Sequence, residues 1–72
     1  MILLLQADAG AAGTLAAAVA AIPGVTQTAV TSGPYDVISH VNPGGDDAMR
    51  QVLDAVRRAD GLTRLCVCRP SR

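Results

Sequence analysis

The chain has 72 residues, with six basic and six acidic side chains, so its formal net charge is zero. This size fits one small domain, 1–72, and the charge balance lacks the basic excess of a nucleic-acid binder, so no direct DNA binding is expected. No apolar run approaches the ~20 residues that span a membrane. Gln6 and Asp8 interrupt the N-terminal apolar run too early for a signal peptide. Both observations indicate a soluble cytoplasmic protein.

The first half of the chain predicts a strand followed by a helix. Residues 1–7 form a continuous apolar run, which is typical of a strand covered on both faces and therefore central in a sheet. Residues 8–13 read as a glycine-containing loop, and Thr14 is a candidate N-cap. Apolar residues then recur at helical spacing at Leu15, Ala18, Val19 and Ile22. Pro23 and the glycine after it end this helix.

Two strands joined by a tight turn come next. Apolar and polar side chains alternate weakly over residues 25–32, and the segment is rich in threonine, which favours an edge strand. The turn 32–36 contains glycine and proline, and residues 36–41 form the following strand.

The last part predicts a second helix and a fourth strand. After a loop at 42–45, Asp46 or Asp47 can cap a helix. Its apolar stripe is Met49, Val52, Leu53 and Val56. Gly61 ends the helical segment, and residues 62–69 read as a strand.

The order of these elements is βαββαβ. The segments PGVTQTAV and DGLTRLCV (23–30 and 60–67) form a faint internal repeat, each running from a helix end through glycine into a strand. Two such halves predict an α+β, ferredoxin-like fold, in which a four-stranded antiparallel sheet carries two helices on one face. The opposite face would expose several leucine-sized side chains, so we expect a two-fold dimer with its sheets face to face.

Motifs for catalysis or metal binding are absent from the sequence. It has no Cys/His dyad at a helix start, no Gly-x-Ser-x-Gly and no phosphate loop, and His40 lies within a strand as a structural histidine. Cys66 and Cys68 should point to the same face of their strand, where a disulfide would be strained, so they are expected to be free thiols packed as small apolar side chains. The arginines near the C-terminus are expected to be solvated or ion-paired. We predict no catalytic, cofactor or metal site, and no enzyme activity.

The turn 32–36 is the strongest candidate for binding a small polar ligand. It consists of Ser32, Gly33, Pro34, Tyr35 and Asp36. Gly33 allows a ligand to approach the backbone closely, Tyr35 offers an apolar wall with one hydroxyl, and Asp36 can accept hydrogen bonds from an ammonium group. The same residues fit equally well a rigid β-turn whose aspartate caps its own backbone.

Three segments of the chain resemble one known family. Ile22-Pro23-Gly24-Val25, then residues 30–38 (VTSGPYDVI), then Gly61-Leu62-Thr63-Arg64 resemble the ligand-binding RAM domain of the Lrp/AsnC transcriptional regulators. The likeness covers essentially the whole chain, in the same order and spacing.

The resemblance implies the same βαββαβ fold, a homodimer formed through the sheets as a dimeric α/β barrel, and rings of such dimers. It also implies that a small effector, typically an amino acid, binds in clefts between dimers. The effector-binding residues carried over are Ser32, Gly33, Pro34, Tyr35 and Asp36. Full-length members carry a helix-turn-helix domain, whereas this chain begins at the first strand and resembles stand-alone members, which would sense amino acids alone or with a full-length Lrp/AsnC paralogue.

Three alternatives remain open at this point. The chain could be a structural assembly partner that binds no effector. It could be an ACT-like amino-acid-binding domain, which shares the fold and would place its ligand at the loop 8–13. An enzyme of the dimeric α/β-barrel type would need polar or acid/base groups lining a cavity between sheet and helices, and the sequence offers almost none.

Overall fold

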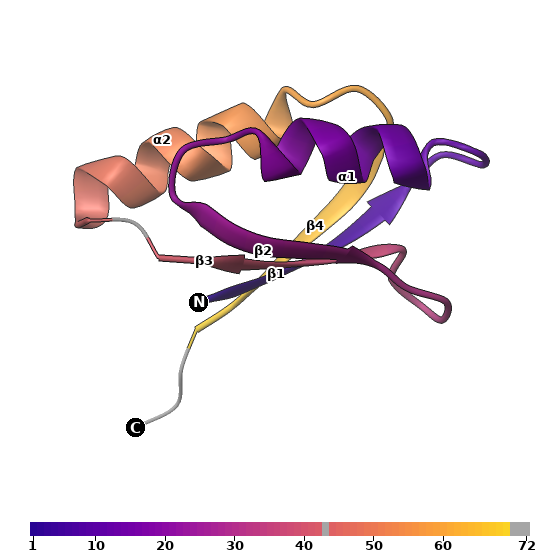
Figure 1. Ribbon diagram of the computed structural model, residues 1–72, viewed down its shortest axis with the longest axis horizontal. Helices are drawn as coiled ribbons and strands as arrows, with labels where there is room; N and C mark the ends of the chain where they lie inside the picture. The colour runs from indigo at the N-terminus through magenta and orange to yellow at the C-terminus, as the bar shows by residue number, and fades with distance from the viewer. Residues whose placement is uncertain (43, 70–72) are drawn as a thin grey trace.

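The computed structural model describes residues 1–42 and 44–69; Pro43, within the predicted loop 42–45, and residues 70–72 lie outside the described part. The elements are β1 (Ile2–Ala7), α1 (Ala12–Ala20), β2 (Val25–Val30), β3 (Val37–Val41), α2 (Asp46–Arg57) and β4 (Leu62–Cys68). Every strand pair is antiparallel, in the order β2-β3-β1-β4, and both helices cover one face of the sheet (Figure 1). The predicted α+β, ferredoxin-like arrangement is confirmed.

The position of each strand follows from its side chains. β1 is apolar on both sides and lies in the interior of the sheet between β3 and β4, as predicted. Its Leu3 and Leu5 are fully buried beneath the helices, whereas Ile2 and Leu4 alternate onto the opposite face and are half-buried. The threonine-rich β2 lies at an edge, also as predicted.

The core fills the layer between the sheet and the helices. The helices contribute Leu15, Val19, Met49, Val52 and Val56 to it. The predicted stripe of α2 is therefore buried except for Leu53, which is half-buried at the margin. Ser39 is fully buried on β3, and its hydroxyl shares a 3.1 Å hydrogen bond with the hydroxyl of Thr28, so the polar group is satisfied.

Both predicted helix caps are wrong. The N-cap of α1 is Ala11, not Thr14, and the N-cap of α2 is Gly45, not an aspartate; neither end has a side-chain cap. The first helix begins early because Gly10, at φ 79°, turns the chain tightly after β1. Asp46 and its neighbour occupy the first turn of α2, where their charges favour the helix dipole. No helix in the described ranges is long and apolar enough to cross a membrane.

Candidate functional site

The connection between β2 and β3, here called the β2–β3 loop (31–36), is longer than the predicted turn because β2 ends at Val30 and β3 begins at Val37. The loop is closed at its base by Thr31, whose N–H donates to the carbonyl of Asp36 at 2.8 Å and whose hydroxyl donates to the carbonyl of Tyr35 at 2.8 Å. Gly33 at its tip has φ 130°, a conformation that side chains other than glycine rarely adopt.

The β2–β3 loop is also fastened to the end of β1. Asp36 Oδ2 accepts a 2.8 Å hydrogen bond from the N–H of Ala7, and the Asp36 N–H donates to the carbonyl of Leu5 at 2.8 Å. Gln6 Nε2 donates to the carbonyl of Pro34 at 2.6 Å. One carboxylate oxygen of Asp36 therefore has a structural partner, while Oδ1 makes no hydrogen bond within residues 1–42 and 44–69.

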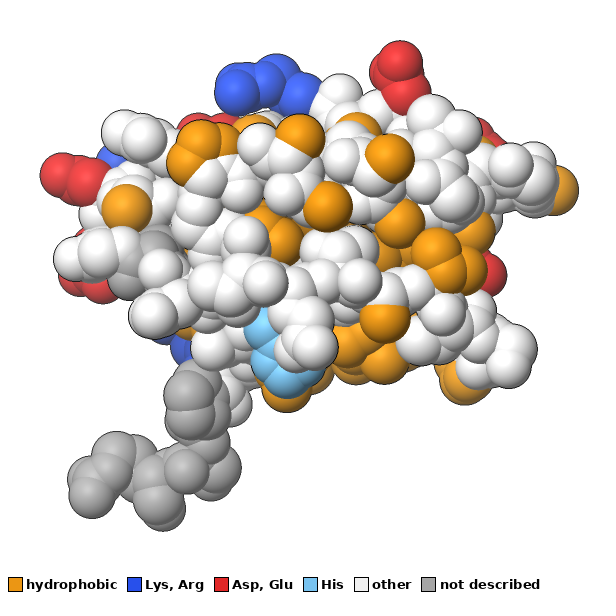
Figure 2. All heavy atoms as spheres, viewed as in Figure 1, with side chains coloured by type: hydrophobic (Ala, Val, Ile, Leu, Met, Phe, Trp, Pro, Cys, Tyr) orange, Lys and Arg blue, Asp and Glu red, His pale blue; other side chains and the backbone are white. Residues whose placement is uncertain are grey.

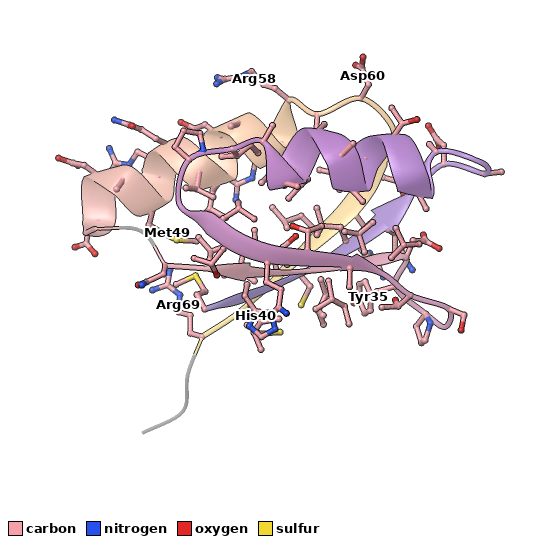
Figure 3. All side chains as sticks on the ribbon, in the orientation of Figure 1. Tyr35, His40, Met49, Arg58, Asp60 and Arg69 are labelled. Carbon is pink, nitrogen blue, oxygen red and sulfur yellow. The ribbon has the colours of Figure 1, made fainter. Side chains whose placement is uncertain are left out.

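The structure thus brings all five predicted effector residues into one ordered loop. Ser32, Gly33 and Pro34 are exposed at its tip, and Tyr35 and Asp36 are half-buried. Tyr35 lies toward the opposite end of the molecule from Met49 and Arg69 (Figure 3). The two cavities described below are lined by other residues, so a ligand at this loop would need a second surface to enclose it.

Within residues 1–42 and 44–69, no layer covers the face of the sheet away from the helices (Figure 1). The strand register places on this uncovered sheet face Ile2, Leu4, Ile38, His40, Cys66 and Cys68. Leu4 lies between Ile38 and Cys66, and Ile2 lies between His40 and Cys68. Figure 2 shows His40 among apolar side chains along this side of the molecule. The register also places Gln6 opposite Arg64 and Gln27 opposite His40 on this face, so its apolar centre is flanked by polar side chains and one arginine.

His40 and the cysteines differ in part from expectation. The side chain of His40 is exposed, and its imidazole makes no hydrogen bond in the described part of the chain, so it is not a satisfied core histidine. Cys66 and Cys68 are free and share one face, as predicted, but they are half-buried rather than buried. The reason is that β4 is an edge strand and this face of the sheet is open.

The two thiols influence each other. Partial burial, and then the negative charge that Cys66 acquires on ionisation, raise the pKa of Cys68. A raised pKa lowers the thiolate fraction at a given pH, and the thiolate is the reactive form.

Replacing Cys66 with serine should therefore make Cys68 react faster with iodoacetamide. The substitution removes the neighbouring charge, so at a pH where Cys66 is ionised the pKa of Cys68 falls and its thiolate fraction rises. Intact-mass spectrometry during alkylation measures the rate. The reciprocal variant, Cys68→Ser, is the control, and equal or slower labelling of Cys68 in Cys66→Ser would contradict the coupling.

Cavities lined by the described residues also lie away from the β2–β3 loop. The larger, about 580 Å³, opens between α2 and the outer ends of β1 and β4, and is lined by Met1, Gly45, Asp46, Met49, Arg50, Leu53, Arg57 and Arg69. The smaller, about 280 Å³, lies between the end of α1 and α2, and is lined by Ile22, Pro23, Gly24, Asn42, Gly44, Ala48, Gln51, Val52 and Ala55. Within the described ranges, no three His, Cys, Asp or Glu side chains are grouped to hold a metal ion.

The arginines of the larger cavity are functional candidates that the sequence analysis missed. Arg50 and Arg57 are seven residues apart on α2, a spacing that places them on one side of a helix and could have drawn attention to them. Arg69 follows β4, and its approach to α2 depends on tertiary structure, for which the sequence carries no local signal.

Comparisons with known proteins find structural relatives. No protein-family model matches the sequence, and no curated protein matches it. The crystal structure of TTHA0845 from Thermus thermophilus superposes with a TM-score of 0.84 at 20% identity, covering 99% of this chain and 94% of that one. The chain shares its fold with that protein. A hypothetical protein from Pyrococcus horikoshii, PHS023, gives a TM-score of 0.81 at 21% identity, over 90% of this chain and 80% of that one. At these identities the likeness concerns the fold alone.

Proposed function

We propose that this chain is a stand-alone effector-binding and oligomerisation module of the RAM type, which senses an amino acid or a related small molecule in the regulation of amino acid metabolism. The observation that carries the proposal is the β2–β3 loop. Hydrogen bonds hold the carbonyls of Pro34 and Tyr35, and one carboxylate oxygen of Asp36 accepts from Ala7 while the other makes no hydrogen bond in the described part of the chain. It acts by binding and assembly, with no catalytic step.

The assembly unit is a homodimer in which two uncovered sheet faces pack against each other as an α/β barrel. In the single chain Ile2, Leu4 and Ile38 remain half-exposed. Full burial of such a side chain contributes about 1.5–3 kcal/mol, and each contact occurs twice in a two-fold dimer. Dimers of this kind can assemble further into rings, which would supply the second surface that the β2–β3 loop needs.

The effector class follows from the groups that the loop presents. Asp36 Oδ1 can accept a hydrogen bond from the ammonium group of an α-amino acid. The exposed backbone at Ser32 and Gly33 can approach its carboxylate, and Tyr35 provides an apolar surface for its side chain. A cleft between neighbouring dimers would enclose the ligand. Output to transcription would pass through co-assembly with a full-length Lrp/AsnC paralogue.

Asparagine at position 36 should abolish amino-acid binding without unfolding the protein. The amide oxygen of asparagine can still accept the hydrogen bond from Ala7, but the charge that holds the ammonium group is lost. Native mass spectrometry with a mixture of the twenty amino acids measures the mass gained by each assembly. We expect a gain in the wild type and none in Asp36→Asn.

Asp60→Asn is the matched control, because Asp60 is exposed on the helix side of the molecule and should leave binding unchanged (Figure 3). An assembly that gains no amino acid in the wild type would count against effector sensing, and a monomer would count against the dimer. Loss of binding in Gly10→Ala but not in Asp36→Asn would assign the ligand to the loop 8–13, as in ACT-like domains.

One observation favours a second candidate, a structural assembly partner that binds no effector. The carboxylate of Asp36 already caps the Ala7 amide, so the loop has a structural role that is complete without a ligand. A stable oligomer that gains no amino acid, together with destabilisation by Asp36→Ala, would select this function.

A further inference from the structure

The cavity between α2 and the outer ends of β1 and β4, here called the arginine groove, has the size and lining of a ligand site. Its volume is about 580 Å³, which lies within the ~300–1,000 Å³ of small-molecule pockets. The groove lies at the opposite end of the molecule from Tyr35, and Met49 and Arg69 mark it in Figure 3. It is therefore separate from the β2–β3 loop.

Positive charge dominates the lining of the arginine groove. Three basic residues, Arg50, Arg57 and Arg69, line it together with one acidic residue, Asp46. Within the described ranges, Arg57 is the groove arginine that makes an ion pair, with Asp54. The two charged groups are 3.9 Å apart and both side chains are exposed, so this pair holds the guanidinium weakly. Neither Arg50 nor Arg69 makes an ion pair within those ranges.

The arginines are arranged along the groove. Seven residues of helix separate Arg50 from Arg57, which corresponds to about 10.5 Å along the axis. Arg69 reaches the same space from the end of β4. Such a row can hold an anion at one point and still border the rest of an extended molecule. A guanidinium binds phosphate or carboxylate oxygens through two parallel N–H donors.

Part of the groove lining is apolar. Met1, Met49 and Leu53 line it beside the cationic groups, and Met49 is 8% exposed while Leu53 is half-buried. Flexible methionine side chains adapt to flat organic surfaces and pack favourably on aromatic rings. A ligand that matches this lining carries an anionic group together with an apolar or aromatic part.

We propose that the arginine groove binds a phosphorylated small molecule of about nucleotide size. A phosphate monoester fits better than a carboxylate because its three terminal oxygens and double charge can engage more than one guanidinium at once. The volume exceeds that of inorganic phosphate and leaves the apolar part of the lining for an organic group. This site is independent of the amino-acid site proposed above and gives the module a second input.

Adenosine 5′-monophosphate is a suitable probe, and isothermal titration calorimetry with the full chain measures its Kd. We expect AMP to bind more tightly than either adenosine or inorganic phosphate. Arg50→Gln and Arg69→Gln should each weaken AMP binding by about tenfold to a hundredfold, the range for losing charge-assisted hydrogen bonds. Both arginines are exposed and glutamine is a good helix former, so these variants keep the fold.

Arg58→Gln is the matched control, because Arg58 is exposed at the end of α2 and lies outside the lining of the groove (Figure 3). It should leave the Kd unchanged. An equal loss in Arg58→Gln would overturn the proposal in favour of diffuse charge attraction. Binding of adenosine or of inorganic phosphate as tight as that of AMP would also overturn it. Loss of AMP binding in Asp36→Asn would move the site to the β2–β3 loop, whereas its retention keeps the two sites distinct.

Discussion

Leu4→Asp should convert the proposed homodimer into a folded monomer. Leu4 lies at the middle of the uncovered sheet face, between Ile38 and Cys66 on the neighbouring strands. Because Leu4 is already half-buried in the single chain, each copy in the proposed dimer loses only about half of the ~1.5–3 kcal/mol for full leucine burial, and it gains a desolvated carboxylate that costs several kcal/mol more. With two copies per interface, the dissociation constant should rise at least ten-thousandfold.

The fold itself should tolerate this substitution, because Leu4 is only half-buried in the single chain and the buried layer of β1 consists of Leu3 and Leu5. Sedimentation velocity measures the mass, and circular dichroism checks the fold. Val30→Asp is the control, because Val30 is 56% exposed and shares a face of the sheet with its partner Val37, which is buried beneath the helices. Val30 therefore lies on the helix face, opposite to Leu4. A Leu4→Asp protein that sediments like the wild-type dimer would place the interface elsewhere.

The sequence predicted the features that depend on alternation and composition. The continuous apolar run of β1 indicated a central strand, and the threonines of β2 indicated an edge. The spacing of Met49, Val52 and Val56 indicated the buried side of α2. In each case the signal lies within one element, because burial of one face imposes a period on the residues of that element.

Features that depend on contacts between distant segments were missed. Asp36 looked equally suited to a ligand or to its own turn, but its partner is the amide of Ala7, 29 positions earlier in the chain. Arg69 faces α2 across the arginine groove for the same kind of reason. Helix starts were misplaced because Ala11 and Gly45 carry no capping side chain, so a search for polar caps could not find them.

Gly61 is another position where the close approach of distant segments matters, and Gly61→Ala should be strongly destabilising. Gly61 has φ 91°, and a Cβ placed there would lie 2.9 Å from the Cβ of Ala11. The carbonyl of Gly61 also accepts a 2.8 Å hydrogen bond from the N–H of Asp8, which fixes the two loops together. Neither segment can move away without breaking this bond.

The expected loss in the free energy of unfolding is about 2–5 kcal/mol, the sum of left-handed backbone strain and overpacking. A domain of this length has a total stability of only about 4–11 kcal/mol, so the loss is a large share of it. Urea denaturation followed by circular dichroism measures the change. Gly13→Ala provides a control of opposite sign: Gly13 lies within α1 with open space around its Cβ position, so alanine should stabilise the helix by about 0.5–1 kcal/mol. Equal stability of the two variants would contradict this prediction. It would show that the loops containing Ala11 and Gly61 can move apart at little cost, so that close packing at Gly61 does not hold them together.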